Sequence, residues 1–255
     1  MTQKALFFDL DGTLAQSDGP PCRQDVEALR TAQKIGHYIF LCTGRSEGCI
    51  YPAITDIGFD GIVAGAGAVV TVNGKTIARR NITRQQMEHF LPLLVQSGQK
   101  SVLEGETLMA TLHMPQNWGG WLNLEDADSF IEHYEEHIIT KFTLYPPFDS
   151  HVREEMEKQL DIIDHGHYLE MLPKGCCKSE GMRRALEELR IPVCDSIAFG
   201  DSFNDLDMLC AAGIGVAMGS SPEEIKQKAD AVTDSVQNAG VSRWLSANLL
   251  NAQSI

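Results

Sequence analysis

The sequence is short of several features that mark particular classes of protein. No uninterrupted apolar stretch reaches the length of about 18 residues that a membrane-spanning helix needs. The seven cysteines are odd in number and show no Cys-x-x-Cys spacing, so neither a disulfide framework nor a zinc site is indicated. The first apolar run begins at Ala5, which leaves no room before it for a signal peptide. We therefore expect a cytoplasmic protein with reduced thiols.

Positive charge is also scarce. The chain of 255 residues carries 21 Lys and Arg against 35 Asp and Glu, which gives a net charge of −14. Such a field repels nucleic acids and anionic membranes, so we expect neither as a partner. A phosphorylated substrate would have to be attracted locally, by a metal ion or by a few placed cations.

What the sequence does contain is a short apolar run that ends in two carboxylates. Ala5 to Phe8 is typical of a fully buried strand, and Asp9 stands at its carboxyl end. Asp11 lies two residues further on, so the two side chains can face one spot before Gly12 turns the backbone away. An Asp-Gly hairpin turn is the ordinary alternative. No second strand follows, however, and a helical pattern begins at Arg23.

Two later apolar runs end in the same way. His37 to Cys42 is followed by Thr43-Gly44-Arg45, and Asp195 to Gly200 is followed by a segment with Asp201, Asn204 and Asp205. Parallel sheets gather ligands at the carboxyl ends of their strands, so these side chains should converge. Oxygen ligands without His or Cys suit Mg²⁺. Each of these segments also has a purely structural interpretation: Thr43-Gly44 could form a turn, Arg45 could form a salt bridge, and Asn204-Asp205 could cap a helix.

The middle of the chain has a different texture. Before it, we expect a helix over residues 46–57 and a hairpin over residues 69–78 with an Asn73-Gly74 turn. Between 83 and 172, helices and strands are interspersed without polar clusters at strand ends. We therefore predict an α/β fold in which a doubly wound, Rossmann-like parallel sheet (residues 1–82 and 173–255) carries an inserted α+β domain (residues 83–172). In this insert, the loop from Trp118 to Trp121 could present an aromatic face to a sugar ring, but packing of the tryptophans against a neighbouring element is the favoured interpretation.

Four motifs in this order resemble those of the haloacid dehalogenase-like phosphohydrolases. The motifs are Asp9-Leu-Asp11-Gly-Thr13, Thr43-Gly44-Arg45, Lys178 at a helix start, and Gly200-Asp201-Ser-Phe-Asn204-Asp205. Each alone is weak, but their order and their places at strand ends are specific. The large insert after the third core strand is similar to the cap domain of the Cof-type sugar-phosphate phosphatases. This chain departs from that group at Ala64 to Ala68, where an Asn-Gly-Ala segment is usual.

The resemblance implies a role for each motif residue. Asp9 would be the nucleophile, and Asp11 would be the general acid and base, oriented by Thr13. Mg²⁺ would be the cofactor, and its site would comprise Asp9, Asp11, Asp201 and Asp205. The phosphoryl group and the rest of the substrate would be held by Thr43, Gly44, Arg45, Lys178 and Asn204. Without the other motifs, Lys178 would be interpreted as a solvated side chain. The helix dipole gives no reason to place a cation there, because a cation at a helix N-terminus is mildly unfavourable.

The expected function is that of a Mg²⁺-dependent phosphatase. It would hydrolyse a small phosphorylated metabolite, with a sugar phosphate as the expected substrate, through an aspartyl-phosphate, and the inserted cap would select the leaving group. The alternatives are a phosphotransferase or phosphomutase of the same fold and a non-catalytic sensor of phosphorylated metabolites. The complete acid pair of Asp9 and Asp11 argues against the sensor, because binding alone does not require both. We expect a monomer or a homodimer.

Overall fold

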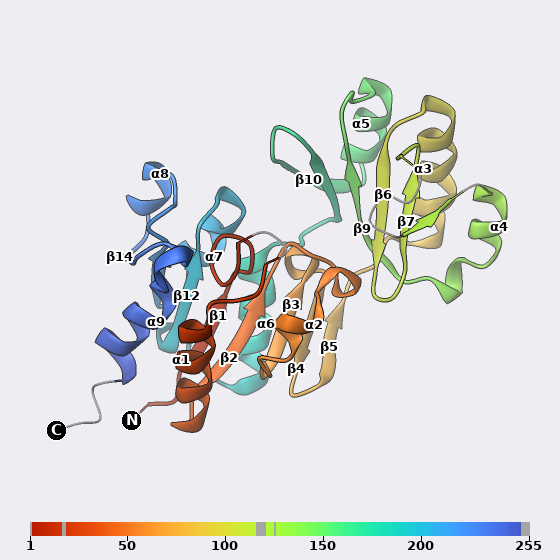
Figure 1. Ribbon diagram of the computed structural model, residues 1–255. Helices are drawn as coiled ribbons and strands as arrows, with labels where there is room; N and C mark the ends of the chain where they lie inside the picture. The colour runs from red at the N-terminus through yellow and green to blue at the C-terminus, as the bar shows by residue number, and fades with distance from the viewer. Residues whose placement is uncertain (1, 17–18, 116–120, 125, 251–255) are drawn as a thin grey trace. The chain divides into compact units, whose positions relative to one another are not determined.

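The computed structural model describes residues 2–16, 19–115, 121–124 and 126–250, and these form two compact units. Unit 1 comprises the described residues up to Gly44, the segment Tyr51–Ala78 and the chain from Cys177 onward. Unit 2 comprises Arg45–Ile50 and Arg79–Cys176 (Figure 1). The insert expected over residues 83–172 thus lies inside the longer segment of unit 2. Residues 45–50, which the sequence analysis placed in the core, group with unit 2 instead.

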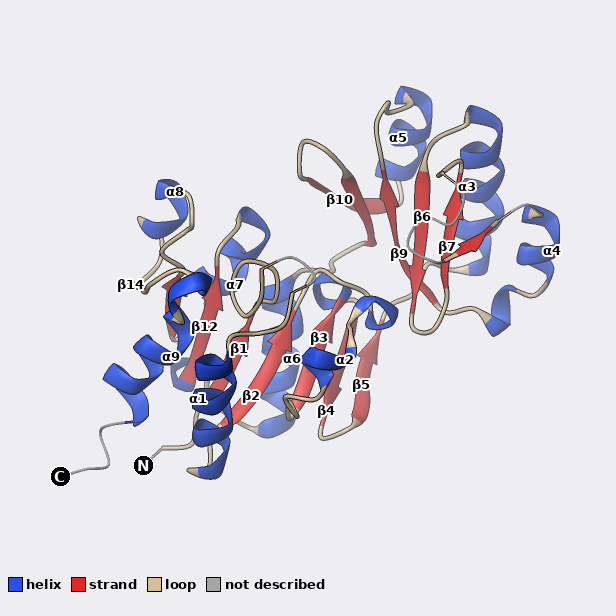
Figure 2. Ribbon diagram, viewed as in Figure 1, coloured by secondary structure: helices blue, strands red, loops and turns tan. Residues whose placement is uncertain are grey.

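Unit 1 is built on an eight-stranded sheet (Figure 2). Its strands, in the order in which they neighbour one another, are β14 (Ala231–Val232), β13 (Ile214–Ala217), β12 (Ser196–Gly200), β1 (Ala5–Phe8), β2 (Tyr38–Cys42), β3 (Gly61–Ala64), β4 (Val69–Val72) and β5 (Lys75–Arg79). The strands from β14 to β3 run parallel, and β4 runs antiparallel to β3. Because β1 lies between β2 and β12, the chain order reverses there, and polar side chains after these strands share one edge.

Helices cover both faces of this sheet. They are α1 (Arg23–Lys34), α2 (Pro52–Thr55), α6 (Lys178–Leu189), α7 (Leu206–Ala211), α8 (Glu223–Lys226) and α9 (Gly240–Leu245). On one face Phe7 stacks on Phe40 at 4.8 Å between ring centroids, in a cluster with residues of α6 and α7. On the other face Phe8 stacks on Phe199 at 4.9 Å, and Trp244 of α9 meets Phe199 edge-on. The prediction of a doubly wound α/β core is confirmed.

Unit 2 contains a six-stranded sheet with helices on one face. Its strands are β10 (Leu160–Asp164), β11 (Leu169–Pro173), β9 (Ile139–Leu144), β6 (Ser101–Gly105), β7 (Met109–Leu112) and β8 (Leu122–Asn123), in that spatial order. The helices are α3 (Arg84–Ser97), α4 (Ala127–Glu132) and α5 (Ser150–Glu157). All three contribute to one apolar cluster with Leu103, Phe142 and Met171 of the sheet. The expected loop at Trp118 to Gly120 lies outside the described residues.

The prediction of one helix over residues 46–57 is wrong. The segment contains a single 3₁₀ turn, Glu47–Cys49, and the short helix α2. Pro52 explains the break, because a proline disfavours the helical conformation of the residue before it. Tyr51 is accordingly extended, with φ −83° and ψ 157°. The 3₁₀ turn is part of unit 2 and lies next to the end of β6, since a Cβ on Gly48 would come within 3.0 Å of the carbonyl oxygens of Gly105 and Glu106.

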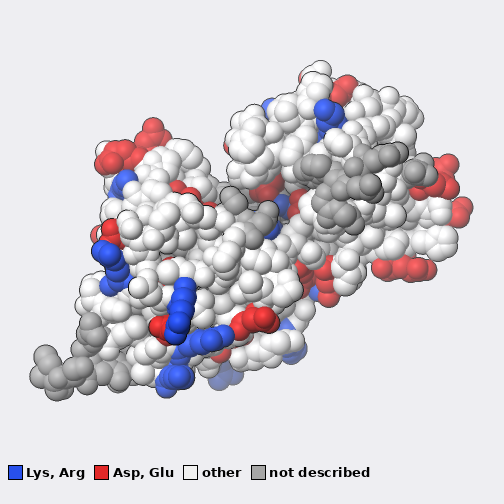
Figure 3. Space-filling model, in the orientation of Figure 1, with Lys and Arg blue, Asp and Glu red and all other residues white. Residues whose placement is uncertain are grey.

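Charged side chains gather at particular places on the surface. Figure 3 shows basic side chains on its face gathered over the part of unit 1 around α1 and acidic side chains at the end of unit 2 around α4. Among the described residues, no helix combines the length and the apolarity needed to cross a membrane.

A buried carboxylate links two helices of unit 1. Asp25 lies in the first turn of α1, and its Oδ1 accepts a hydrogen bond from the Ser242 N–H of α9 at 2.7 Å. Its Oδ2 is buried and has no hydrogen-bond partner among the described residues. Burial raises the pKa of Asp25 to about 6, although the Ser242 N–H acts in the opposite direction. The stabilisation linked to the protonated form is complete below the unfolded pKa and is lost as the pH rises through about 6.

We therefore expect Asp25→Asn to change the pH dependence of stability. The amide stays neutral and can still accept from Ser242. Between about pH 4 and pH 7 the wild type should lose roughly 1–3 kcal/mol of unfolding free energy relative to the variant, on the scale of about 1.4 kcal/mol per pKa unit. Urea unfolding of both proteins at the two pH values measures the difference. Parallel pH dependences would contradict the assignment.

Candidate active site

Three carboxylates meet at the carboxyl edge of the sheet in unit 1. Asp9 follows β1, Asp201 follows β12, and Asp205 ends the short turn η6 (Phe203–Asp205). Each of the three offers an oxygen atom, and these atoms lie within 4.8 Å of one another. The parallel pairing of β1 with β12 explains this, because Phe8 and Phe199 are register partners one and two residues before the two acids. The structure thus brings together the first and last motifs of the sequence.

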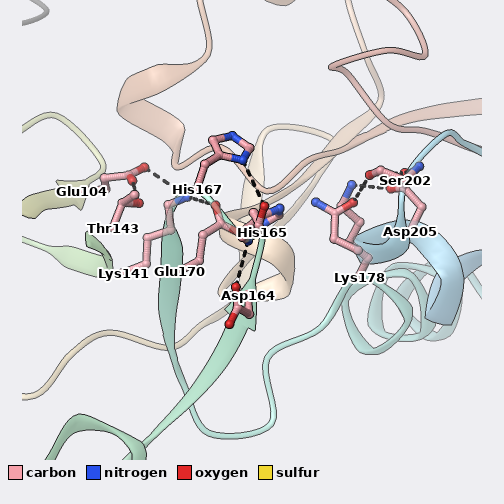
Figure 4. Close-up of polar contacts among 12 residues, drawn as sticks. Glu104, Lys141, Thr143, Asp164, His165, His167, Glu170, Lys178, Ser202 and Asp205 are labelled. Atoms are coloured by element: carbon pink, nitrogen blue, oxygen red, sulfur yellow. Dashed lines mark hydrogen bonds and ion pairs between the residues drawn. The ribbon is translucent and has the colours of Figure 1, made fainter. Parts of the chain in front are cut away.

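Lys178 ties this cluster together. It is the first residue of α6 and is almost completely buried. Its Nζ lies 2.6 Å from Oδ1 of Asp9 and 2.5 Å from Oδ1 of Asp205 (Figure 4 labels the lysine and Asp205). Burial opposes the charged form, but the carboxylates of Asp205 and Asp9 outweigh it and raise the pKa of Lys178 well above its usual value. The reading of Lys178 as a solvated side chain is therefore wrong.

Asp205 supports the loop that carries Asp201. Its Oδ2 accepts hydrogen bonds from the backbone N–H groups of Asp201 and Ser202, both at 3.0 Å. The Ser202 hydroxyl in turn donates to Oδ1 of Asn204 at 2.5 Å. Gly200 makes room for this arrangement, because a Cβ at that position would lie 2.5 Å from Cβ of Asp205. Both oxygens of Asp205 are therefore engaged within unit 1.

The electrostatics of the cluster favour an added cation. Burial and the neighbouring Asp205 raise the pKa of Asp9 well above its usual value, with Lys178 acting against them. Burial and Asp205 likewise raise the pKa of Asp201 to about 7. Oδ1 of Asp201 is buried and has no hydrogen-bond partner among the described residues. An orphaned carboxylate oxygen beside a second carboxylate fits the oxygen ligation of Mg²⁺.

The turn after Asp9 requires glycine. Gly12 has φ +93°, and a Cβ there would lie 2.3 Å from Oδ2 of Asp201. Asp11 precedes it and is exposed. Thr13 is fully buried, and its hydroxyl has no hydrogen-bond partner among the described residues. The structure therefore does not show the contact by which Thr13 was expected to orient Asp11.

The second motif is divided between the two units. Thr43 is buried at the end of β2, where its N–H donates to the Val63 carbonyl at 2.8 Å and its carbonyl accepts from the Ala66 N–H at 3.0 Å. Gly44 is the last residue before the chain leaves unit 1. Arg45 groups with unit 2, and its Nη1 donates to the Cys49 carbonyl at 3.4 Å. Thr43 and Gly44 thus share a unit with the acid cluster, whereas Arg45 does not.

Unit 2 holds a second buried ion cluster that the sequence analysis missed. Lys141 of β9 lies 3.3 Å from Oε2 of Glu104 on β6 and also contacts Glu170 of β11 (Figure 4). The Thr143 hydroxyl donates to Glu104, and His165 Nε2 lies 3.1 Å from Oε2 of Glu170. Burial acts to raise the pKa of Glu170, but Lys141 and His165 lower it to about 2. These residues lie on the sheet face opposite the helices.

The signal that the sequence analysis missed is an alternation of charged and apolar residues within three strands. Glu104 alternates with Leu103 in β6, Lys141 with Phe142 in β9, and Glu170 with Met171 in β11. Only the strand register, which pairs Glu104 with Lys141 and Thr143 with Glu170, shows that the charges meet.

Comparison with known proteins agrees with the motifs. Residues 6–245 match the family model described as haloacid dehalogenase-like hydrolase. The chain is 27% identical over 248 residues to the putative phosphatase YkrA of Bacillus subtilis strain 168, covering 95% of this chain and 96% of that protein. It is 24% identical over 275 residues to the pyridoxal phosphate phosphatase YbhA of Escherichia coli K12, covering 98% and 100%. It superposes on the phosphatase BT1666 from Bacteroides thetaiotaomicron with a TM-score of 0.81 and 25% identity, covering 96% and 94%.

The buried cluster of unit 2 leads to a stability prediction. Lys141→Met would leave the buried Glu104 without a cation and Glu170 with only His165, so we expect a loss of about 3–5 kcal/mol of unfolding free energy. Lys158→Met is the matched control, because it removes the pair of an exposed lysine with Glu155 and should cost less than about 1 kcal/mol. Chemical denaturation of both variants measures the two losses. Equal small losses would show that the buried cluster contributes no more than a surface pair.

Proposed function

The chain belongs to the haloacid dehalogenase-like hydrolases and is a phosphoric monoester hydrolase of the Cof type, and we propose that it uses Mg²⁺ to hydrolyse a sugar phosphate. The observation that carries this proposal is the buried contact of Lys178 with Asp9, beside an oxygen of Asp201 that has no hydrogen-bond partner in the described part of the chain. That arrangement supports the roles proposed here for a carboxylate nucleophile, a fixed cation and a bound metal ion. We also propose a cytoplasmic location, which the odd number of cysteines and their spacing support.

Asp9 and Asp11 divide the chemistry between them. A carboxylate oxygen of Asp9 attacks phosphorus and forms an aspartyl-phosphate, and the bond from phosphorus to the leaving oxygen breaks. Asp11 gives its proton to that oxygen. In the second half-reaction Asp11 takes a proton from water, which attacks the phosphorus and releases Asp9. The exposure of Asp11 suits this exchange of protons, whereas the burial of Asp9 suits a nucleophile that must be held in place.

The remaining residues hold the phosphoryl group and the metal. Mg²⁺ would be held by Asp9, Asp201 and the backbone carbonyl of Asp11, and when bound it would neutralise charge on the phosphoryl oxygens. Asp205 has both oxygens engaged, which supports a role behind Asp201. Lys178 stabilises developing negative charge, since it is already placed against the nucleophile. Thr43, Gly44 and Asn204 are proposed as hydrogen-bonding partners of the phosphoryl oxygens.

Substrate selection is assigned to unit 2. The residues of the acid cluster account only for the phosphoryl group, so another part of the chain must distinguish one leaving group from another. We assign this role to unit 2 as a cap, with Arg45 as a candidate contact because it groups with that unit. The pyridoxal phosphate phosphatase among the relatives makes a phosphorylated cofactor the second candidate substrate.

A substrate panel tests the proposal. Sugar phosphates, pyridoxal phosphate and nucleotides should be assayed for phosphate release with Mg²⁺, with EDTA, and with EDTA followed by excess Mg²⁺. We expect release that EDTA abolishes and Mg²⁺ restores, and the highest kcat/KM for a sugar phosphate. A requirement for a second alcohol would identify a phosphotransferase or mutase, and binding without turnover would identify a sensor. Undiminished turnover in EDTA would contradict the metal requirement.

Asparagine variants of Asp9 and Asp11 test the separate roles proposed for these residues. Asp9→Asn should abolish turnover, because the amide cannot act as the nucleophile. Asp11→Asn should slow turnover by about 10²–10⁴-fold, the usual loss of general acid and base catalysis. Steady-state assays with a poor leaving group measure both effects, and unchanged thermal midpoints would show that the fold is retained. Wild-type turnover by Asp11→Asn would exclude its role in proton transfer.

A further inference from the structure

Helix α6 carries Lys178 but lacks a cap of its own. The preceding residue, Cys177, is extended, and its side chain makes no capping hydrogen bond to the helix. The first backbone N–H groups of a helix need acceptors from outside it. One such acceptor comes from a different helix, because Oδ2 of Asp207 in the first turn of α7 accepts from the Ser179 N–H at 2.9 Å. Resting on the function proposed above, we propose that Asp207 is a positioning residue that fixes Lys178 by capping α6 from α7.

The contact of Asp207 with Ser179 is one of two contacts between the start of α7 and the first turn of α6. Asp205, two residues before Asp207, receives the ammonium group of Lys178 at 2.5 Å. Asp207 receives the backbone N–H of the residue that follows Lys178. The start of α7 thus holds the first turn of α6 at two points, one on the lysine side chain and one on the backbone. A carboxylate near a helix N-terminus is also favoured by the helix dipole.

On the side that faces the sheet, close packing restricts the position of α6. A Cβ on Gly67 would lie 2.3 Å from the carbonyl oxygen of Cys177, and a Cβ on Gly181 would lie 2.3 Å from Cγ1 of Val63. The helix start is therefore pressed against β3 and the loop that follows it. Asp207 holds it from the side of α7. Small displacements matter at this place, because a shift of about 1 Å in a catalytic group can cost on the order of 10²-fold in rate.

Two substitutions at this position separate the hydrogen bond from the charge. Asp207→Asn keeps an oxygen that can accept from Ser179, whereas Asp207→Ala removes it. We expect Asp207→Ala to lower kcat by roughly 10-fold or more with a smaller change in KM, and Asp207→Asn to stay within about 3-fold of the wild type. Equal losses in the two variants would overturn the capping role, because charge alone would then explain them.

A matched cap elsewhere controls for stability. Asp149 caps α5 in unit 2 by accepting from the Val152 N–H, also at 2.9 Å. Asp149→Ala should lower the thermal midpoint about as much as Asp207→Ala, since loss of an N-cap typically costs about 1 kcal/mol. Its kcat should remain that of the wild type. A fall in kcat of the same size in both variants would show that lost stability, not the position of Lys178, is responsible.

Two measurements do not depend on turnover. Hydrogen exchange followed by mass spectrometry should show faster exchange in residues 178–181 of Asp207→Ala and unchanged exchange there in Asp207→Asn and Asp149→Ala. Lys178 should also become more reactive toward an amine-acylating reagent in Asp207→Ala. If the wild type releases no phosphate from any substrate, these two results still decide the positioning role. Wild-type exchange and wild-type labelling in Asp207→Ala would overturn it.

Discussion

The contact of Lys178 with two buried carboxylates is the interaction on which the rest of unit 1 depends. Asp9, Asp201 and Asp205 bring oxygens within 4.8 Å of one another, and like charges at about 4 Å repel by roughly 4 kcal/mol even at the effective dielectric of a protein surface. Lys178 offsets part of this repulsion because its Nζ touches two of the three. The charge that remains is what a divalent cation would balance. The close packing of the carboxylates also explains the glycines at positions 12 and 200, because a side chain at either position would collide with one of these acids.

The two units use buried charge in different ways. In unit 1 one oxygen of Asp201 has no hydrogen-bond partner among the residues that the structure describes, and such an oxygen can bind a ligand. In unit 2 the lysine at 141 faces two glutamates, and a histidine and a threonine complete their hydrogen bonds. Replacing such a network by apolar residues of similar volume is often neutral or even stabilising, but the network restricts which strands can pair, because a register shift would separate the charges. The cluster of unit 2 therefore fits a role in specifying the sheet.

Much of unit 1 could be predicted from the sequence, and the reasons are local. Ala5–Phe8 and Ser196–Gly200 are short apolar runs followed by acids, and a parallel sheet places such acids together whatever the intervening chain does. The contact of Asp207 with Ser179 could not be predicted, because it depends on how two helices pack. The same holds for Glu104 and Lys141, whose meeting depends on strand register. The helix expected over residues 46–57 failed for a local reason, the proline at 52.

The chain passes between the two units at four peptide bonds, Gly44–Arg45, Ile50–Tyr51, Ala78–Arg79 and Cys176–Cys177. Unit 2 is therefore not one continuous piece of the gene. The short segment before Tyr51 contributes Ser46, whose hydroxyl donates to Glu104 at 3.2 Å, and Glu47, which lies 3.5 Å from Arg79. Recombination that exchanged only the long insert between two relatives would leave these contacts mismatched. Cap grafts, in evolution or in the laboratory, must transfer the loop after β2 together with the insert.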